Sequence, residues 1–325
     1  MIDKLRNIAI IAHVDHGKTT LVDQLLRQSG TLDRKELENE RVMDSNDQEK
    51  ERGITILAKN TALKWHDYDI NIVDTPGHAD FGGEVERVMS MVDCVLLVVD
   101  SIDGPMPQTR FVTQKAFDAG LHPIVVVNKI DRPGARPDWV VDQVFDLFDN
   151  LGASDEQLDF PILYASARQE YAVTDLEAPR QDMEPLLRAM LEHVPAPSGN
   201  PDLPLQMLVA ALDYDQYLGQ IGIGRIFRGK LRAREPVALI NREGGTSLHT
   251  VEKVFVFHGL ERLEVSEARS GEIVAMTGVD KVAIGDTITA PEQPEALPSI
   301  DIEDPTVKMT FGVNTSPFMG QEGPL

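Results

Sequence analysis

The sequence predicts an α/β domain built on a mostly parallel sheet, followed by an all-β barrel. In residues 1–197, nearly continuous apolar runs rich in β-branched residues alternate with helical patterns. Such runs are typical of parallel strands that helices cover on both faces. After the proline-rich segment 194–201 the pattern changes to a period of two, with short strands and polar or Gly-rich turns over residues 203–290. These two patterns predict two domains joined by a linker.

Buried strands of the first domain are expected in the apolar runs 7–12, 70–73, 94–99, 123–127 and 160–164. A further strand over 61–66 is joined to the second of these runs by a turn of three residues. So short a connection permits only antiparallel pairing, which predicts one antiparallel edge strand. The clearest helix is expected over 137–151, because its apolar residues fall on one stripe and Pro137 suits a first helical turn.

A second linker over residues 290–305 carries four prolines. Residues 307–313 then resemble the first strand of a further domain. The segment 305–325 is far too short to fold independently, so we expect it to be the start of a truncated domain of a longer protein.

Composition excludes several functional classes. The chain has 325 residues, 42% apolar and 26% charged, which is ordinary for a soluble globular protein. Its net charge of −22 disfavours indiscriminate nucleic-acid binding, which depends on neutralising phosphates with Lys and Arg. No stretch reaches the length of a membrane span, and no signal peptide is evident. Cys94 is the one cysteine and is expected to be buried, so we predict a cytoplasmic protein without membrane partners.

The loop after the first strand has the pattern of a phosphate-binding loop. A Gly-Lys-Thr sequence stands between an apolar strand and a helical pattern, so backbone N–H groups and the helix dipole would face an anion. Lys18 can reach β- and γ-phosphate oxygens, and the Thr19 hydroxyl can ligate Mg²⁺. The first position of the motif is Ala12 rather than Gly. The candidate nucleotide-binding residues here are Asp15, His16, Gly17, Lys18, Thr19 and Thr20.

Two further motifs suit the phosphate end of a nucleotide. Asp74 closes the strand 70–73, where a carboxylate can serve Mg²⁺ through a water molecule. Gly77 would let the backbone approach a γ-phosphate, and His78 could orient an attacking water. Thr55, in the sequence Glu-Arg-Gly-Ile-Thr-Ile, could close over the same metal ion. Taken singly, His78 would be better interpreted as a turn or capping residue, and Thr55 could equally begin a strand.

Two motifs suit the base. Asn128, Lys129 and Asp131 follow the strand 123–127, and an Asp carboxylate can accept hydrogen bonds from both N1–H and N2 of guanine. Ser166 and Ala167 follow the last predicted strand, where the Ala167 N–H could donate to the guanine O6. Each motif is weak alone, but all five occur in order at the carboxyl ends of strands, where α/β sheets bind ligands.

With these residues in view, the chain resembles a translational GTPase. The hallmarks are Ala-His-Val-Asp-His-Gly-Lys-Thr-Thr at 12–20, Glu-Arg-Gly-Ile-Thr-Ile at 51–56 and Asp-Thr-Pro-Gly-His at 74–78. The segments 41–47, 79–88, 104–110 and 314–318 most closely resemble the BipA/TypA branch. The resemblance implies a Ras-like P-loop nucleotide domain and a translation-factor β-barrel. Further domains and a C-terminal module that binds the ribosome are also implied, and this chain does not contain them.

The resemblance also implies roles for individual residues. His78 would be catalytic, Val14 and Ile54 would form an apolar gate beside it, and Asp15 would help to hold a monovalent cation, K⁺ or Na⁺. GTP would be the substrate and GDP the product, with Mg²⁺ on Thr19, Thr55 and, through water, Asp74. The expected partners are ribosomal RNA and ribosomal proteins, with roles in large-subunit assembly and stress growth. Guanosine tetraphosphate would fit the same pocket.

Two rival functions remain open from the sequence. An ATP-using P-loop kinase or ATPase shares the first motif, although Asn128–Asp131 argues against it. A nucleotide-gated binding module with negligible hydrolysis is the second rival, although Thr55 and His78 argue against that. Separately, basic residues occupy every second position over 228–234. On one strand they would share a face, which is either a solvated surface, the preferred interpretation, or a contact for rRNA phosphates.

Overall fold

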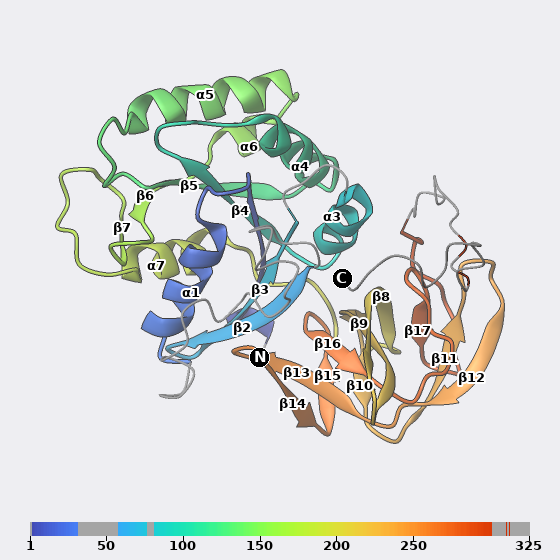
Figure 1. The fold of residues 1–325 in the computed structure, drawn as a ribbon. Helices are drawn as coiled ribbons and strands as arrows, with labels where there is room; N and C mark the ends of the chain where they lie inside the picture. The colour runs from blue at the N-terminus through green and yellow to red at the C-terminus, as the bar shows by residue number, and fades with distance from the viewer. Residues whose placement is uncertain (1, 32–57, 77–80, 301–309, 311, 313–325) are drawn as a thin grey trace, which may run out of the picture.

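The computed structural model describes residues 2–31, 58–76, 81–300, 310 and 312. Within these residues an α/β unit precedes an all-β unit, and the two lie side by side (Figure 1). The expected fold class is therefore confirmed. Apart from Thr310 and Gly312, the predicted start of a further domain lies outside the described residues. No helix in the described ranges is long and apolar enough to cross a membrane.

In the described part of the chain, seven strands form the first sheet, in the order β2-β3-β1-β4-β5-β6-β7. The five central strands are parallel: β1 (Leu5–Ala12), β3 (Tyr68–Asp74), β4 (Cys94–Asp100), β5 (His122–Asn128) and β6 (Ile162–Ser166). The edge strand β2 (Lys59–Trp65) is antiparallel to β3, as the short turn predicted. A second antiparallel edge, β7 (Tyr171–Val173), was not predicted, because three residues are too few for a periodic pattern.

The predicted strand 160–164 lies two residues further along, at Ile162–Ser166. Pro161 has no N–H to donate to a ladder, so it stands before the strand while its carbonyl still accepts from the N–H of Val125. The strand ends on Ala165 and Ser166, which the apolar pattern left out. This shift matters, because it places Ser166 at the last strand position and Ala167 directly after it.

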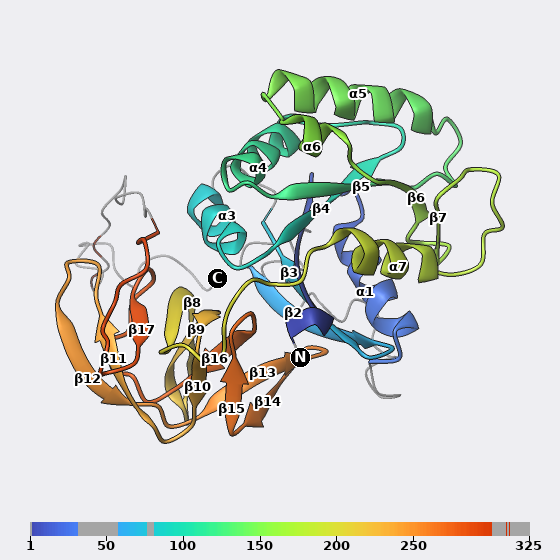
Figure 2. The same ribbon diagram turned by 180° about the vertical axis from the view of Figure 1, so that it is seen from behind.

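Helices cover both faces of this sheet (Figures 1 and 2). On one face, α1 (Lys18–Gln28) and α7 (Glu184–His193) pack on alternate residues of β1, among them Ile8 and Ile10. Ala9 and Ile11 face the opposite core, with α3 (Gly82–Met89), α4 (Pro107–Asp118) and α5 (Pro137–Asn150). The short helices are η1 (Ile2–Lys4) and α6 (Asp155–Leu158). Burial on both faces explains why β1 has no polar alternation.

Two local expectations hold. Helix α5 begins at Pro137, ends one residue before the predicted bound, and buries Val140, Val144 and Phe148. Cys94 is buried in β4, and this burial raises the pKa of its thiol to about 12. The thiol therefore behaves as a small apolar side chain at physiological pH.

The all-β unit contains an eight-stranded antiparallel sheet, in the order β12-β11-β17-β8-β9-β16-β13-β14, and the described pair β10-β15. Its core includes Met207, Ile226, Leu231, Val254 and Ile288. The strands are β8 (Gln206–Asp215), β9 (Gly219–Arg228), β10 (Lys230–Arg232), β11 (Pro236–Ile240), β12 (Thr246–Thr250), β13 (Val254–His258), β14 (Glu261–Val265), β15 (Glu267–Arg269), β16 (Ile273–Met276) and β17 (Thr287–Thr289).

The basic run does not form one strand. Gly229 separates β9 from β10 and has a φ of 75°, and a Cβ at this position would lie 2.6 Å from the Leu205 backbone. Arg228 pairs with Glu295, and Arg232 Nε lies 2.6 Å from a Glu267 carboxylate oxygen. These neighbouring carboxylates fit the preferred interpretation of a solvated face.

A buried polar contact joins the two units. Arg225 on β9 places Nη2 2.8 Å from a carboxylate oxygen of Asp93 and donates through Nη1 to the Met91 carbonyl. Asn7 on β1 donates to the other Asp93 oxygen at 3.0 Å and to the Gly271 carbonyl at 2.9 Å. Burial raises the pKa of Asp93, although Arg225 and Asn7 oppose that shift. Both charges depend on each other across the interface.

Removing one charge of this pair leaves the other buried without a partner. Arg225→Met is therefore expected to lower the free energy of unfolding by about 3–5 kcal/mol. Arg225→Met combined with Asp93→Asn should recover part of that loss. Urea unfolding of the two variants measures the effect. Arg188→Ala is the matched control, because its pair with Glu184 is exposed and contributes at most about 0.5 kcal/mol. If Arg225→Met and Arg188→Ala lowered the free energy of unfolding equally, the stabilising role of the Arg225–Asp93 pair would be contradicted.

Candidate functional site

The candidate site lies along the carboxyl edge of the parallel sheet. β1 leads into the loop before α1, β3 ends at Asp74, β4 ends at Asp100, and β5 ends at Asn128. Because these strands are parallel and adjacent, their ends meet at one edge. The fold thus assembles the predicted residues of the described part of the chain along one edge, although they are far apart in sequence.

Gly17 allows the phosphate-loop pattern to fold against β5. Its φ is 91°, in the left-handed region that favours glycine. A Cβ at this position would lie 2.5 Å from Asn128 Nδ2, so any side chain would displace the asparagine. Gly17 also precedes α1 and offers no capping side chain, which leaves first-turn N–H groups of the helix for an anion.

Lys18 and Asp74, predicted to bind phosphate and a metal ion, lie side by side. Lys18 Nζ is 2.8 Å from an Asp74 carboxylate oxygen and also donates to the Thr75 carbonyl. Both side chains are almost fully buried. Thr19 follows Lys18 at the start of the helix and is half-buried. A hydroxyl and a carboxylate are hard oxygen donors, so this donor set fits Mg²⁺, which takes few protein ligands beside phosphates. The described residues contain no larger cluster of metal-binding side chains.

Asn128 connects the two ends of the site. Its Nδ2 donates to the His16 carbonyl at 2.9 Å, and its Oδ1 accepts from the Ala167 N–H at 3.1 Å. The Ala167 N–H, predicted to meet a ligand, thus holds Asn128 in this structure. Ser166 is fully buried, and its hydroxyl accepts from the Gln169 N–H. Asp131 is half-buried, and within the described ranges its carboxylate has no hydrogen bond or ion pair.

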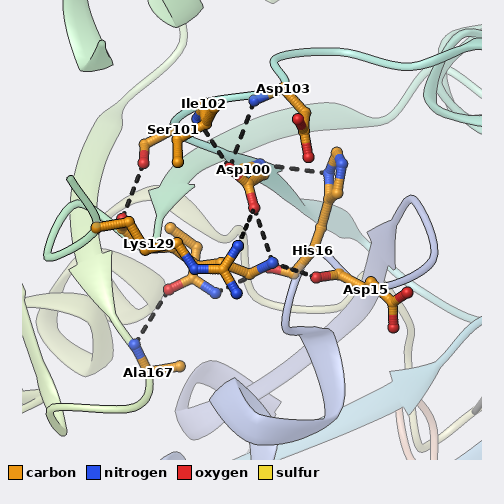
Figure 3. A network of polar contacts seen from close by, with 10 residues as sticks. Asp15, His16, Asp100, Ser101, Ile102, Asp103, Lys129 and Ala167 are labelled. Carbon is orange, nitrogen blue, oxygen red and sulfur yellow. Dashed lines mark hydrogen bonds and ion pairs between the residues drawn. The ribbon is translucent and has the colours of Figure 1, made fainter. Parts of the chain in front are cut away.

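Asp100 is a residue of the site that the sequence analysis missed. One carboxylate oxygen lies 2.7 Å from Lys129 Nζ, and the other accepts from the Ile102 N–H at 2.8 Å (Figure 3). Lys129 Nζ also donates to the Asp15 carbonyl. Burial alone would raise the pKa of Asp100, but hydrogen bonds from Lys129 and Ile102 outweigh burial and lower it. Its position at the end of an apolar strand, like that of Asp74, was the available signal.

His16 is held as a neutral ring. It is almost fully buried, and its Nδ1 accepts from the Asp100 N–H at 3.3 Å. Burial, together with the nearby His13 and Lys129, lowers the pKa of His16 to about 4, and Asp100 opposes this shift. Figure 3 shows the ring beside Asp100, while the Asp15 carboxylate points away from the Asp100–Lys129 pair.

Several predicted residues lie outside the described residues. These are Thr55, Gly77, His78 and Ile54, together with the rest of the polar segment 41–56 that carries Thr55. Thr20 and Asp15 are described and exposed at the site, and Val14 is half-buried.

The lowered pKa of His16 predicts a pH-dependent stability. The unfolded chain takes up this proton near pH 6.5 and the folded chain only near pH 4, so acidification favours unfolding between these values. At 1.36 kcal/mol per pKa unit, the loss is about 3 kcal/mol. His16→Asn keeps an acceptor near the position of Nδ1 and removes the titration. Urea unfolding from pH 7.5 to 4.5 should show a shallower decline for this variant. An unchanged slope would contradict the assignment.

Comparison with known families was consistent with this geometry. Residues 3–196 match the elongation factor Tu GTP binding domain, and residues 219–289 match elongation factor Tu domain 2. The first match covers β1 to α7 and all the site residues described above.

Individual proteins are similar over almost the whole chain. The large ribosomal subunit assembly factor BipA of Salmonella typhimurium is 66% identical over 323 residues, which is 99% of this chain and 53% of that protein. BipA of Escherichia coli K12 has the same identity and coverage, and that of Haemophilus influenzae is 65% identical with 52% of its length covered. The chain thus spans about half the length of these relatives. Residues 3–196 match the GTP binding domain of elongation factor Tu, and charged residues lie at the expected strand ends, so the chain belongs to the translational GTPase family.

Proposed function

We propose that this chain binds GTP and hydrolyses it to GDP and phosphate, as part of a cytoplasmic factor that acts on the ribosome. The observation that carries the proposal is the juxtaposition of two chemically distinct groups on one sheet edge. Lys18 and Asp74 suit phosphates and a metal ion, and Asn128 joins the phosphate loop to the segment of Asp131. Together these groups would contact the phosphate end and the base end of one nucleotide.

Guanine recognition rests on Asp131. Its carboxylate is not engaged by a hydrogen bond or ion pair in the described part of the chain, so both oxygens are available to N1–H and N2 of the base. Adenine has no such pair of donors. Asn128 holds the phosphate loop, and the stem of Lys129 would lie over the guanine ring. This carboxylate argues against the rival ATPase or kinase function.

Phosphate binding uses the loop from Asp15 to Thr20. Lys18 neutralises β- and γ-phosphate charge, and the backbone N–H groups at the start of α1 face the same oxygens. Mg²⁺ would be held by Thr19, Thr55 and, through water, Asp74, and would neutralise the charge that develops on the phosphates. Asp15 would hold a monovalent cation, K⁺ or Na⁺.

Hydrolysis is assigned to His78, which would orient a water molecule towards the γ-phosphate, beside the apolar gate of Val14 and Ile54. The phosphate loop supplies no arginine to stabilise the transition state in cis. A slow intrinsic rate with strong stimulation by a partner follows, and such stimulation reaches about 10³- to 10⁵-fold in this chemistry. Release of the segment 41–56 after hydrolysis would switch the protein between two states.

The relatives' name assigns them to assembly of the large ribosomal subunit. We infer the same partner here: rRNA and ribosomal proteins, mainly through domains beyond this chain. A role in stress growth and occupancy of the pocket by guanosine tetraphosphate belong to the same proposal. So do the domain bounds 1–197, 203–290 and 305–325, with the last as the start of a further domain. The turnover experiment below distinguishes this proposal from the second rival, a nucleotide-gated binding module with negligible hydrolysis.

Base specificity tests the binding half of the proposal. Wild-type chain with Mg²⁺ should bind GTP and GDP at micromolar concentrations or tighter and bind ATP at least 100-fold more weakly. In Asp131→Asn, the amide can donate to the 2-oxo group of xanthine, so preference should shift from guanosine to xanthosine nucleotides. Isothermal titration with the four nucleotides measures both effects. Equal affinity of the wild type for ATP and GTP would refute guanine selectivity.

Turnover tests the catalytic half. GTP hydrolysis by the chain and by a longer version should be slow alone and faster with purified ribosomes. His78→Ala should retain GTP binding but lose most of the stimulated rate, since water positioning is removed and the phosphate contacts stay. Phosphate release at saturating GTP is the measurement. Undiminished turnover in His78→Ala would rule out the assigned role. If neither the chain nor the longer version hydrolyses the GTP that it binds, the nucleotide-gated binding module would be favoured.

A further inference from the structure

A buried carboxylate at the end of β4 has no assigned part in nucleotide binding. Asp100 is fully buried, although isolated charges are costly in a protein interior. Its partner is the Lys129 ammonium, 2.7 Å away, with the Arg132 guanidinium at 3.7 Å. If Lys129 left this position, the buried Asp100 carboxylate would lose its nearest cation and keep only the more distant Arg132. The carboxylate therefore fixes where the lysine side chain lies.

Lys129 has a second contact, on the phosphate loop. Its ammonium donates to the Asp15 carbonyl as well as to Asp100. Both Lys129 and Asp15 have positive φ values, 65° and 63°, which are unfavourable for residues with a side chain. Contacts from the surrounding structure must hold such conformations. The contacts of Lys129 with the Asp100 carboxylate and the Asp15 carbonyl are among the contacts that can hold them.

Asp100 also ties the backbones around it. In the sheet it pairs with Asn128, so the carboxylate lies beside the segment that leads to Asp131. Its N–H donates to His16 in the phosphate loop, and its Oδ1 accepts from the Ile102 N–H (Figure 3). One residue therefore contacts the phosphate loop, the turn after β4 and the base-recognition segment.

We propose that Asp100 is a positioning residue of the nucleotide site, which holds Lys129 so that the phosphate loop and the guanine-recognition segment keep one relative arrangement. Asp100 itself does not touch the nucleotide. The inference rests on the proposed function, since it assigns a task within the same pocket. It concerns nucleotide affinity rather than the chemical step, because hydrolysis is assigned to groups that would act on the γ-phosphate and not on the base.

Asp100→Asn tests this inference in the full chain. The Asn side chain carries no charge, and with its oxygen on the Ile102 N–H its NH₂ group faces the Lys129 ammonium. The ion pair is therefore lost and the lysine is no longer held. We expect GDP to bind about 10- to 100-fold more weakly, mostly through faster dissociation, a range typical of residues that orient a binding group. KM for GTP should rise in parallel while kcat does not fall. Stopped-flow with a fluorescent GDP analogue and steady-state turnover measure these quantities.

Asp103→Asn is the matched control. It removes the same charge from the turn that follows Asp100, but its carboxylate is exposed and has no partner among the described side chains. We expect GDP affinity within twofold of the wild type. A weakening equal to that of Asp100→Asn would show that net charge alone matters and would overturn the proposal.

A double-mutant cycle separates positioning from a general structural role. If Asp100 acts through Lys129, then Asp100→Asn should weaken GDP binding by less than twofold in a Lys129→Met background. A merely structural Asp100 would weaken binding by the same factor in both backgrounds, and that result would overturn the proposal. The comparison of Lys129→Met with the double variant also covers the case in which Asp100→Asn alone does not fold, because the double variant buries no unpaired charge.

The outcomes distinguish this inference from the function on which it rests. Wild type that binds GDP together with an Asp100→Asn variant of equal affinity would overturn the positioning role and leave the GTPase proposal intact. Wild type that binds no guanine nucleotide in the presence of Mg²⁺ would overturn both.

Discussion

The site depends on the pairing of buried charges at the ends of parallel strands. Asp74 and Asp100 each close a strand directly after a run of buried apolar residues, and both carboxylates are almost completely removed from water. Such a carboxylate requires a cation or several donors close by. Lys18 meets Asp74, and Lys129 meets Asp100. The two lysines assigned to nucleotide binding are thus held in place by ion pairs with buried carboxylates of the sheet.

This constraint explains why the loops of the site have so little freedom. The phosphate loop is held from above by Asn128 and Lys129, which both donate to its carbonyl groups. Gly17, within the loop, allows this close approach, because a Cβ there would collide with Asn128. A site held in this way is organised before a ligand arrives, so less conformational entropy is lost on binding.

The second unit of the molecule is joined to the same sheet at the opposite ends of its strands. Asn7 lies near the start of β1, and Asp93 directly precedes β4; both contact the all-β unit through Arg225 or Gly271. The strands β1 and β4 therefore connect the interface at one end to the nucleotide edge at the other. Apolar residues of β8, β9 and β16 extend the same core, so the interface is packed as well as paired.

Sequence alone predicted the fold class, which the structure confirms, and named most of the residues of the candidate site. Glycine at position 17, lysine at 18 and the Asn128–Asp131 segment are identifiable because each chemistry needs a particular residue type directly after an apolar strand. Periodicity could not identify β7, which is too short, or the break at Gly229, whose necessity comes from the distant Leu205 backbone. Asp100 was missed because its role depends on contacts with Lys129 and His16, which are distant in sequence. That the Ala167 N–H donates to Asn128, that His16 is neutral, and that Arg225 joins the units were decided by tertiary structure. Hydrogen bonds and desolvation depend on atoms brought together from distant parts of the chain, and no local pattern contains them.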